Sequence, residues 1–319
     1  MEEPEISVFM ENSIMDLPER IEICEVVLRD GLQNEKVSPD LAQRRKIHDL
    51  LFAAGIRRFE AGSMVNPKAV PQMAITDELC RLLPADQAEY RVLVLNRKGV
   101  ERAIECGVAK AKLTVSVSET HQIKNTRMNH AEIFAKFADV AQLAAESHIE
   151  LSGAMATAFG CPFEGKISEA QVISVVERYL AIGVKELSLS DTSGMANPRQ
   201  VFELCTSMKK RFPEVIWNLH FHDTRGMGFA NVLAGMQAGI TRFDASLGGL
   251  GGCPFVPGAT GNIATEDLVY MCDQMGVATG VSLDGLLAAS DELENAVGHP
   301  LDSAIRFVMR RPAPPCAQQ

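Results

Sequence analysis

The chain has 319 residues, of which 46% are hydrophobic and 23% are charged, and its formal net charge is -10. This composition is typical of a globular protein with a large core, and it excludes a chain that is disordered throughout. The acidic balance, without any long run of Lys and Arg, argues against binding to nucleic acid or to an anionic membrane surface.

The chain begins with the acidic stretch MEEPEISVFMENSIMDLPER, which has neither a signal-peptide nor a transit-peptide pattern. No apolar run is long enough to span a membrane, and the eight cysteines are scattered without a CxxC pair. We therefore expect a cytoplasmic protein with free thiols. The predicted organisation is an N-terminal extension (1–19), one barrel domain with C-terminal helices (20–310) and a flexible, Pro-rich tail (311–319).

Strand-like apolar runs follow at eight places, separated by segments with helical periodicity. The runs are IEICEVVL (21–28), IRRFEAG (56–62), YRVLVL (90–95), AKLTVSVS (111–118), IELSGAMATAF (149–159), KELSLSD (185–191), VIWNLHFH (215–222) and TRFDASLGG (241–249). Strict alternation of strand and helix predicts an α/β fold, a (β/α)₈ TIM barrel, with an eighth helix and two short additional helices after residue 264. An open doubly wound sheet is less consistent, because LRDGLQNE after the first strand lacks the GxGxxG pattern.

Polar residues stand at the carboxyl ends of several predicted strands, where (β/α)₈ barrels carry their reactive groups. They are Arg29, Asp30, Glu60, Ser118, Asp191, His220 and His222, and the last strand leads into a glycine-rich loop with Cys253. These ends should converge on one mouth.

His220 and His222 are two residues apart on a strand, so their side chains point to the same face. Both imidazoles can then reach one divalent cation, and Asp30 and Asn262 are the candidate oxygen ligands. The alternative is that both histidines are structural.

Arg29, beside the candidate ligand Asp30, is expected to hold an oxyanion while Glu60 orients it. Asp191 is either a proton acceptor or a cap for the helix that begins near Asn197. Cys253 lies in a segment too rich in Gly and Pro for helix or strand, which suits a proton donor delivered by a loop. Cys161 is the competing functional thiol.

Five stretches together resemble the hydroxymethylglutaryl-CoA lyase family of metal-dependent (β/α)₈ lyases. They are RDGLQNEK (29–36), NPKAVPQM (66–73), FGCPFEGKIS (159–168), HFHDTRG (220–226) and GGLGGCPFVPGATGNIATEDLVYM (248–271). The resemblance implies cleavage of (3S)-3-hydroxy-3-methylglutaryl-CoA to acetyl-CoA and acetoacetate. We also expect a homo-oligomer, dimer or tetramer, and a place in leucine degradation, with ketone-body formation as an alternative pathway. The resemblance also implies Mg²⁺ or Mn²⁺ on Asp30, His220, His222 and Asn262.

The resemblance further implies roles for the remaining candidates. Arg29 would hold the enolate oxygen, Cys253 would protonate C2, and Asp191 would accept the hydroxyl proton. Gln33 and Glu60 would support Arg29 and the substrate. Ser118, at the end of the fourth predicted strand, is a further candidate substrate-binding residue, with Gln33 and Arg29.

Departures from the family pattern leave the acyl group open. They are Val27-Leu28 before the Arg-Asp pair, Gly62, Met64 and Ala69 where bulkier or hydroxylated residues are common, and VGHPLDS (297–303) in place of a more basic turn. A lyase for a related 3-hydroxyacyl-CoA, such as citramalyl-CoA, is the alternative. Three other functions fit less well. A hydrolase of the amidohydrolase type would carry its His-x-His pair on the first strand, whereas here the pair is on the seventh. A condensing enzyme would need a further domain, and a barrel that had lost catalysis would lack one or more of the proposed ligands.

Overall fold

The computed structural model describes residues 15–252 and 261–310. Within them, eight strands form a closed barrel in sequence order, and every neighbouring pair is parallel. The strands are β1 (Glu22–Glu25), β2 (Arg58–Ser63), β3 (Glu89–Leu93), β4 (Lys110–Ser116), β5 (Glu150–Ala156), β6 (Glu186–Asp191), β7 (Ile216–Phe221) and β8 (Arg242–Ala245). The pairing of β8 with β1 closes the ring, and the predicted (β/α)₈ barrel is confirmed.

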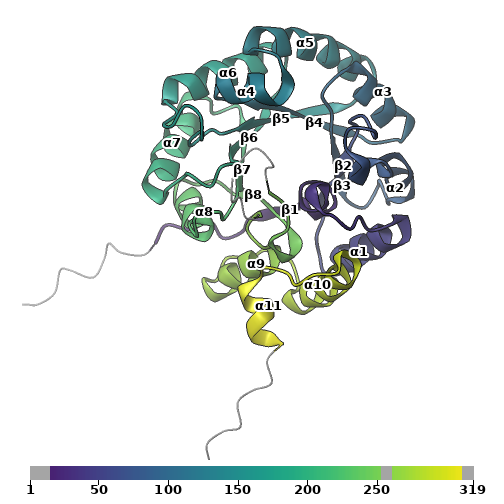
Figure 1. Cartoon of the computed structure of the whole chain (residues 1–319). Coiled ribbons are helices and arrows are strands. Elements are labelled where there is room, and N and C mark those ends of the chain that lie inside the picture. The colour runs from purple at the N-terminus through teal and green to yellow at the C-terminus, as the bar shows by residue number, and fades with distance from the viewer. Residues whose placement is uncertain (1–14, 253–260, 311–319) are drawn as a thin grey trace, which may run out of the picture.

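Helices surround this barrel, as the end-on view in Figure 1 shows. They are α1 (Leu41–Ala53), α2 (Thr76–Leu82), α3 (Arg97–Glu105), α4 (Glu119–Thr126), α5 (His130–Glu146), α6 (Glu169–Ala181), α7 (Pro198–Arg211), α8 (Gly228–Gln237), α9 (Thr265–Gln274), α10 (Leu283–Val297) and α11 (Ala304–Met309). Several begin at a side-chain cap: Asp40, Asn129 and Ser168 each close a capping box at the start of α1, α5 and α6. Within the described residues, no helix has the length and apolar character needed to cross a membrane.

The C-terminal helices differ from the prediction in one respect. The additional helices are present, but α10 has 15 residues and is not short. Its start is fixed to the end of α1, because Ser282 N donates to Ala54 O at 2.7 Å, and the two helices pack side by side in Figure 1. Thus α10 covers the barrel next to α1, and its length follows from that packing.

The first strand is also shorter than predicted. β1 ends at Glu25, and Val27–Gly31 form a π-helical turn in which Asp30 N and Gly31 N both donate to Val26 O. The apolar residues Val26, Val27 and Leu28 look like strand in sequence, but they are buried in this turn. The turn carries the Arg-Asp pair from the strand end into the mouth of the barrel.

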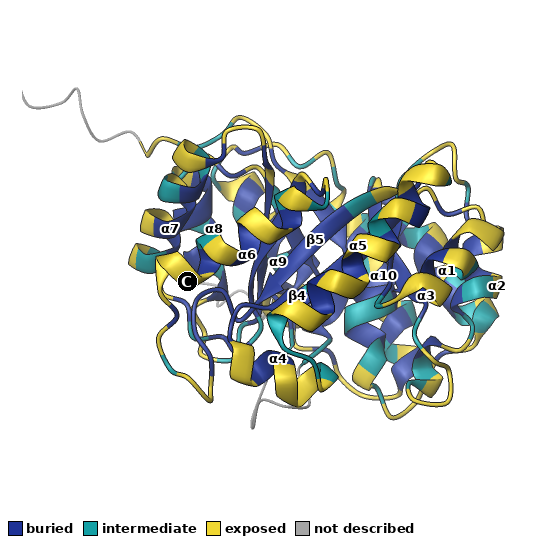
Figure 2. Ribbon diagram, turned by 90° about the horizontal axis from the view of Figure 1, so that it is seen from above, coloured by how far each residue is buried: buried dark blue, intermediate teal, exposed yellow. Residues whose placement is uncertain are grey.

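The strands lie inside the ring of helices, and the exposed residues are mainly on the outer faces of the helices and in the loops (Figure 2). Inside the barrel, however, alternate residues of several strands are charged or polar. The buried ones are Arg58 and Glu60 on β2, Arg91 on β3, Lys110 and Lys112 on β4, Glu186 and Ser188 on β6, Asn218 and His220 on β7, and Asp244 on β8. Buried charges must be paired, so the barrel interior holds layers of ion pairs beneath the mouth.

Candidate active site

The Arg29–Asp30 turn brings a guanidinium and a carboxylate to the mouth of the barrel. Arg29 donates through Nη1 to Asp30 Oδ1, and its Nε lies 3.3 Å from Glu60 Oε1 as an ion pair. Glu60 is fully buried and also accepts from Arg91 and Lys112. Glu60 therefore holds Arg29 from below, as the sequence predicts for its orienting role.

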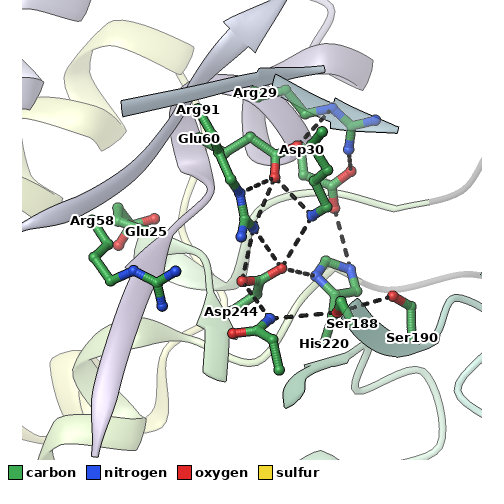
Figure 3. Close-up of polar contacts among 12 residues, drawn as sticks. Glu25, Arg29, Asp30, Arg58, Glu60, Arg91, Ser188, Ser190, His220 and Asp244 are labelled. Atoms are coloured by element: carbon green, nitrogen blue, oxygen red, sulfur yellow. Dashed lines mark hydrogen bonds and ion pairs between the residues drawn. The ribbon is translucent and has the colours of Figure 1, made fainter. Parts of the chain in front are cut away.

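His220 and His222 are brought together at the end of β7, as the two-residue spacing predicts. Their Nε2 atoms lie 3.1 Å apart, and Asp30 Oδ2 lies 3.8 Å from His220 Nε2 and 3.7 Å from His222 Nε2. Both imidazoles are buried, and Asp30 is partly exposed toward the mouth. Three side chains from opposite ends of the sequence thus point at one another, two of them labelled in Figure 3.

Asn262 completes this group from the segment after β8. A backbone bridge pairs it with His222, and its Nδ2 donates to Asp30 Oδ2 at 2.8 Å and to Leu250 O at 3.0 Å. Its Oδ1 is buried and has no hydrogen-bond partner within the described residues. Gly251, with φ of 124°, lets the backbone pass so close that any side chain there would collide with the Asn262 amide.

Asp30 and the two imidazoles can hold a divalent cation. Adjacent ligand atoms of an octahedral ion with bonds of about 2.1 Å lie about 3 Å apart. The Nε2 atoms of His220 and His222 are 3.1 Å apart, close to this spacing, and Asp30 Oδ2 lies 3.8 and 3.7 Å from them, within reach of the same ion. His220 Nδ1 contacts Asp244 Oδ2 at 3.3 Å, so that Nε2 is turned to the other ligands, an arrangement common for metal-binding imidazoles. The amide of Asn262 turns its Nδ2 to Asp30, and its oxygen, unpartnered within the described residues, is the atom that a cation would bind. Imidazole and oxygen donors together form a mixed N/O set that suits a divalent cation.

Electrostatics keep the oxygen ligand ionised. Burial by itself would raise the pKa of the Asp30 carboxyl, but Arg29 and the two imidazoles hold it below its ordinary value. Beneath it, burial opposes the ionised form of Glu60, yet Lys112 and Arg91 lower its pKa to about 2. Figure 3 shows the resulting network, in which Arg91 and Asp244 link the mouth to the barrel interior.

A cavity of about 160 Å³ opens above these groups. It is lined by Arg29, Asp30, Gln33, Lys112, Thr114, His121, Asn125, Ala154, Ala156, Ser190, Thr192, His220, His222 and Gly252. Gln33 therefore lies where the sequence predicts it. The prediction missed Lys112, Thr114 and the pair His121 and Asn125, which share one face of α4. The period-two spacing of polar residues on β4 and the i, i+4 spacing on α4 are the signals that could have found them.

Ser118 and Asp191 stand at strand ends but do not line this cavity. Ser118 is buried and caps α4 by accepting from His121 N, and Cys161 Sγ donates to its hydroxyl. Asp191 accepts from Met195 N at 2.8 Å and Ala196 N at 2.9 Å, while Asn197 caps α7 in its place. Burial raises the pKa of the Asp191 carboxyl to about 6. Their functional roles remain predictions.

The two candidate thiols have different standing. Cys161 is fully buried and lies against Ser118, as expected for a packing residue. Cys253 lies outside the described residues, and its role as a proton donor stays a prediction.

Comparison with known proteins adds to this geometry. A family model described as HMGL-like matches residues 20–293. The chain belongs to this family. A hydroxymethylglutaryl-CoA lyase of Bacillus subtilis is 40% identical over 91% of this chain and 97% of its own length. A (R)-citramalyl-CoA lyase of Chloroflexus aurantiacus is 41% identical over 90% of this chain and 94% of its own length.

Solved structures of HMGL-like proteins superpose closely on this one. An HMG-CoA lyase of Acinetobacter baumannii, solved with coenzyme A and 3-methylmalate, has a TM-score of 0.88 and 42% identity and covers 93% of this chain and 98% of its own. The Bacillus subtilis HMG-CoA lyase structure has a TM-score of 0.89 and 39% identity, with 93% and 100% coverage. The protein is therefore an enzyme of the lyase class, as predicted.

Proposed function

We propose that this chain is a divalent-cation-dependent carbon–carbon lyase that cleaves (3S)-3-hydroxy-3-methylglutaryl-CoA to acetyl-CoA and acetoacetate. The observation that carries the proposal is the meeting of Asp30, His220 and His222 at one point beside Arg29, with the Asn262 amide bonded to Asp30. Relatives with this name, at about 40% identity over most of the chain, support the acyl-CoA substrate.

Asp30, the two imidazoles and the Asn262 oxygen would hold Mg²⁺ or Mn²⁺. When bound, the cation lowers the pKa of the substrate hydroxyl and offsets the charge of its carboxylate. The four side chains come from the end of β7, the turn after β1 and the segment before α9. Side chains held in place in this way would orient the acyl group with little reorganisation. The family is generally metal-dependent, and the identity of the ion is part of the proposal.

The chain's residues then divide the proton and charge transfers. The proton leaves the C3 hydroxyl, the C2–C3 bond breaks, and its electron pair becomes the enolate of acetyl-CoA while C3 becomes the ketone of acetoacetate. Arg29, held by Glu60, faces the cavity with donors for the enolate oxygen. In this proposal Gln33 contacts the substrate, and Ser118 supports it indirectly from behind α4.

Asp191 and Cys253 are the proposed proton carriers. The pKa of Asp191, raised to about 6, suits a group that accepts a proton near neutral pH. Both of its oxygens already accept backbone N–H groups, so the proton would reach it through water or a neighbouring side chain. Cys253 would deliver a proton to C2 of the enolate, which completes acetyl-CoA.

Citramalyl-CoA is the second candidate substrate, because a relative with 41% identity carries the name (R)-citramalyl-CoA lyase. The two thioesters differ by one methylene between the carbinol carbon and the free carboxylate. One methylene changes specificity by about 10- to 200-fold in typical pockets. The same catalytic residues would release pyruvate in place of acetoacetate.

A direct assay tests the choice. Purified protein with Mg²⁺ should release acetoacetate from hydroxymethylglutaryl-CoA, and citramalyl-CoA should have a much lower kcat/KM. The reverse order would move the assignment to citramalyl-CoA. Cleavage of neither thioester would overturn the proposed function.

The proposal also covers the setting of the enzyme. A single catalytic domain over 20–310 is supported by the one closed barrel and by the packing of α10 on α1. A cytoplasmic location is supported by the free cysteines at 24, 80, 106, 161, 205 and 272. A homodimer or homotetramer and a place in leucine degradation belong to the same proposal, and light scattering of the purified protein would measure the first.

A further inference from the structure

Glu25, the last residue of β1, has a fully buried carboxylate that the proposed chemistry does not use. Its Oε1 accepts from Val27 N at 2.8 Å and from Leu247 N at 3.0 Å. Its Oε2 accepts from Thr265 Oγ1 at 2.6 Å. Three donors from three separate segments therefore meet on one side chain.

Each of these segments carries part of the cation site. Val27 begins the turn that holds Arg29 and Asp30. Leu247 begins the segment after β8 that runs to Gly251 and Gly252, and Gly252 lines the cavity beside the cation site. Thr265 begins α9, three residues after Asn262. The carboxylate of Glu25 thus lies behind the cation site and joins the segments that supply Asp30 and Asn262.

This carboxylate differs from those of Glu60 and Asp244 in the barrel interior. Glu60 and Asp244 contact Arg91 and Lys112, whereas the hydrogen bonds of Glu25 within the described residues all come from neutral donors. Burying a carboxylate without a cation is costly, and burial raises the pKa of Glu25 to about 7. A hydrophobic side chain would fill the space at lower cost, so the polar group is explained by the three bonds that it makes.

We propose that Glu25 is a positioning residue that sets the spacing between Asp30 and Asn262 and so determines the affinity for the divalent cation. The inference rests on the proposed function for the nature of the cation. The bonded segments are short: Asp30 is five positions after Glu25, and Asn262 is three positions before Thr265. A shift of either segment would therefore move the ligand atoms as well, because few residues lie between them and the bonds to Glu25.

The decisive measurement is the affinity of the full-length protein for Mn²⁺, by calorimetric titration. Glu25→Leu fills the space without making the bonds and should weaken Mn²⁺ binding by about 10- to 100-fold, the usual effect of losing a supporting partner of a metal ligand. Glu25→Gln can keep all three bonds, because Oε1 still accepts both N–H groups and Nε2 can donate to the Thr265 hydroxyl. It should restore affinity close to that of the wild type.

The control is Glu186→Gln, which also removes a buried carboxylate but lies at the opposite end of the barrel. It should lower stability without changing Mn²⁺ affinity. Thr265→Val removes one of the three bonds with almost no change in shape and should weaken Mn²⁺ binding by a smaller factor than Glu25→Leu.

Unchanged Mn²⁺ affinity in folded Glu25→Leu would overturn the inference and leave Glu25 a purely structural residue. If that variant does not fold, Thr265→Val decides, and unchanged affinity there has the same meaning. Failure of the proposed function gives a different result, in which the wild type binds Mn²⁺ but cleaves neither thioester.

Discussion

At the amino-terminal end of the barrel, the carboxylate of Glu186 is surrounded by three cationic side chains. Lys110 Nζ lies 2.6 Å away, Arg58 2.9 Å and Arg242 3.3 Å. At the carboxyl-terminal end, Asp30 meets one guanidinium, two imidazoles and an amide whose oxygen lacks a partner within the described residues. The first cluster is neutralised by the protein itself, whereas the second gathers a carboxylate and two imidazoles whose electron-pair donors lie within 4.8 Å of one another.

The layer between the two ends shows how the contrast is built. Asp244 accepts from Arg91 and Lys112 below and contacts His220 above. Burial opposes its charge, but these cations hold the pKa of Asp244 well below its ordinary value. The layer thus keeps an anion beneath His220 and favours the orientation in which the imidazole turns its Nε2 to the mouth. The two ends should accordingly respond to mutation in different ways.

The largest effect is expected from His222→Ala at the mouth. Loss of a ligand should weaken Mn²⁺ binding by at least about 100-fold, more than the loss of a supporting partner, and abolish turnover. The barrel should stay folded, because the residue lies at the rim beyond β7. Mn²⁺ titration and circular dichroism measure the two outcomes, and a loss of structure equal to the loss of affinity would break the contrast between the ends.

Cys253→Ala should have the next largest effect, and it separates proton donation from cation binding at the mouth. Loss of a proton donor should lower kcat by about 10² to 10⁴, while Mn²⁺ affinity stays near that of the wild type. Steady-state kinetics beside a metal titration would separate the two. Equal losses in kcat and in affinity would instead make this thiol a structural residue.

Glu186→Gln probes the amino-terminal end. Three cations would lose their shared anion in a buried setting, which should cost about 3 kcal/mol of unfolding free energy. Urea denaturation measures this cost. Mn²⁺ affinity and kcat of the folded variant should not change, and a parallel fall in Mn²⁺ affinity would show that the two ends are coupled.

The smallest expected effect is a difference between two buried glutamates, Glu25 and Glu186, in how their contribution to stability depends on pH. Burial raises the pKa of Glu25 above its ordinary value of 4.5 to about 7, whereas the pKa of Glu186 is lowered, because Lys110 and the arginines outweigh its burial. Between pH 4.5 and 7 folded Glu25 keeps a proton that the unfolded chain loses, so its contribution to stability falls as pH rises through this window. Glu186 contributes to folding stability at pH values above the ordinary pKa of a glutamate. This contribution is lost as pH falls through the lowered pKa of Glu186.

Stability curves of two glutamine variants test these opposite signs. Glu25→Gln should gain about 1 to 2 kcal/mol relative to the wild type as pH rises from about 5 to about 8. The deficit of Glu186→Gln should instead shrink below about pH 4. Parallel pH curves for the two variants would contradict the different environments seen at the two ends.

Much of the site could be predicted because it follows local rules. His220 and His222 share a face through their spacing, and Asp30 follows a strand that must end at the mouth. The charged interior could not be predicted from apolar periodicity alone, because that pattern does not show which polar residues point inward, although Lys110, Lys112 and Thr114 alternate along β4. The π-helical turn at Val27–Gly31 was missed because its residues have strand-like side chains, while its shape depends on bonds to Val26 and Glu25.

The sequence by itself determined the order of strands and helices, and so the barrel, because hydrophobic periodicity depends only on spacing along the chain. It also determined which residue types stand at the strand ends. Only the tertiary structure decided which of them meet. Asp30 and Asn262 are 232 positions apart and bond because β8 closes on β1. Asp191 also stands at a strand end, but its carboxylate accepts from the backbone of the loop that follows, at Met195 and Ala196. The conformation of the loop after a strand therefore decides where such a side chain points.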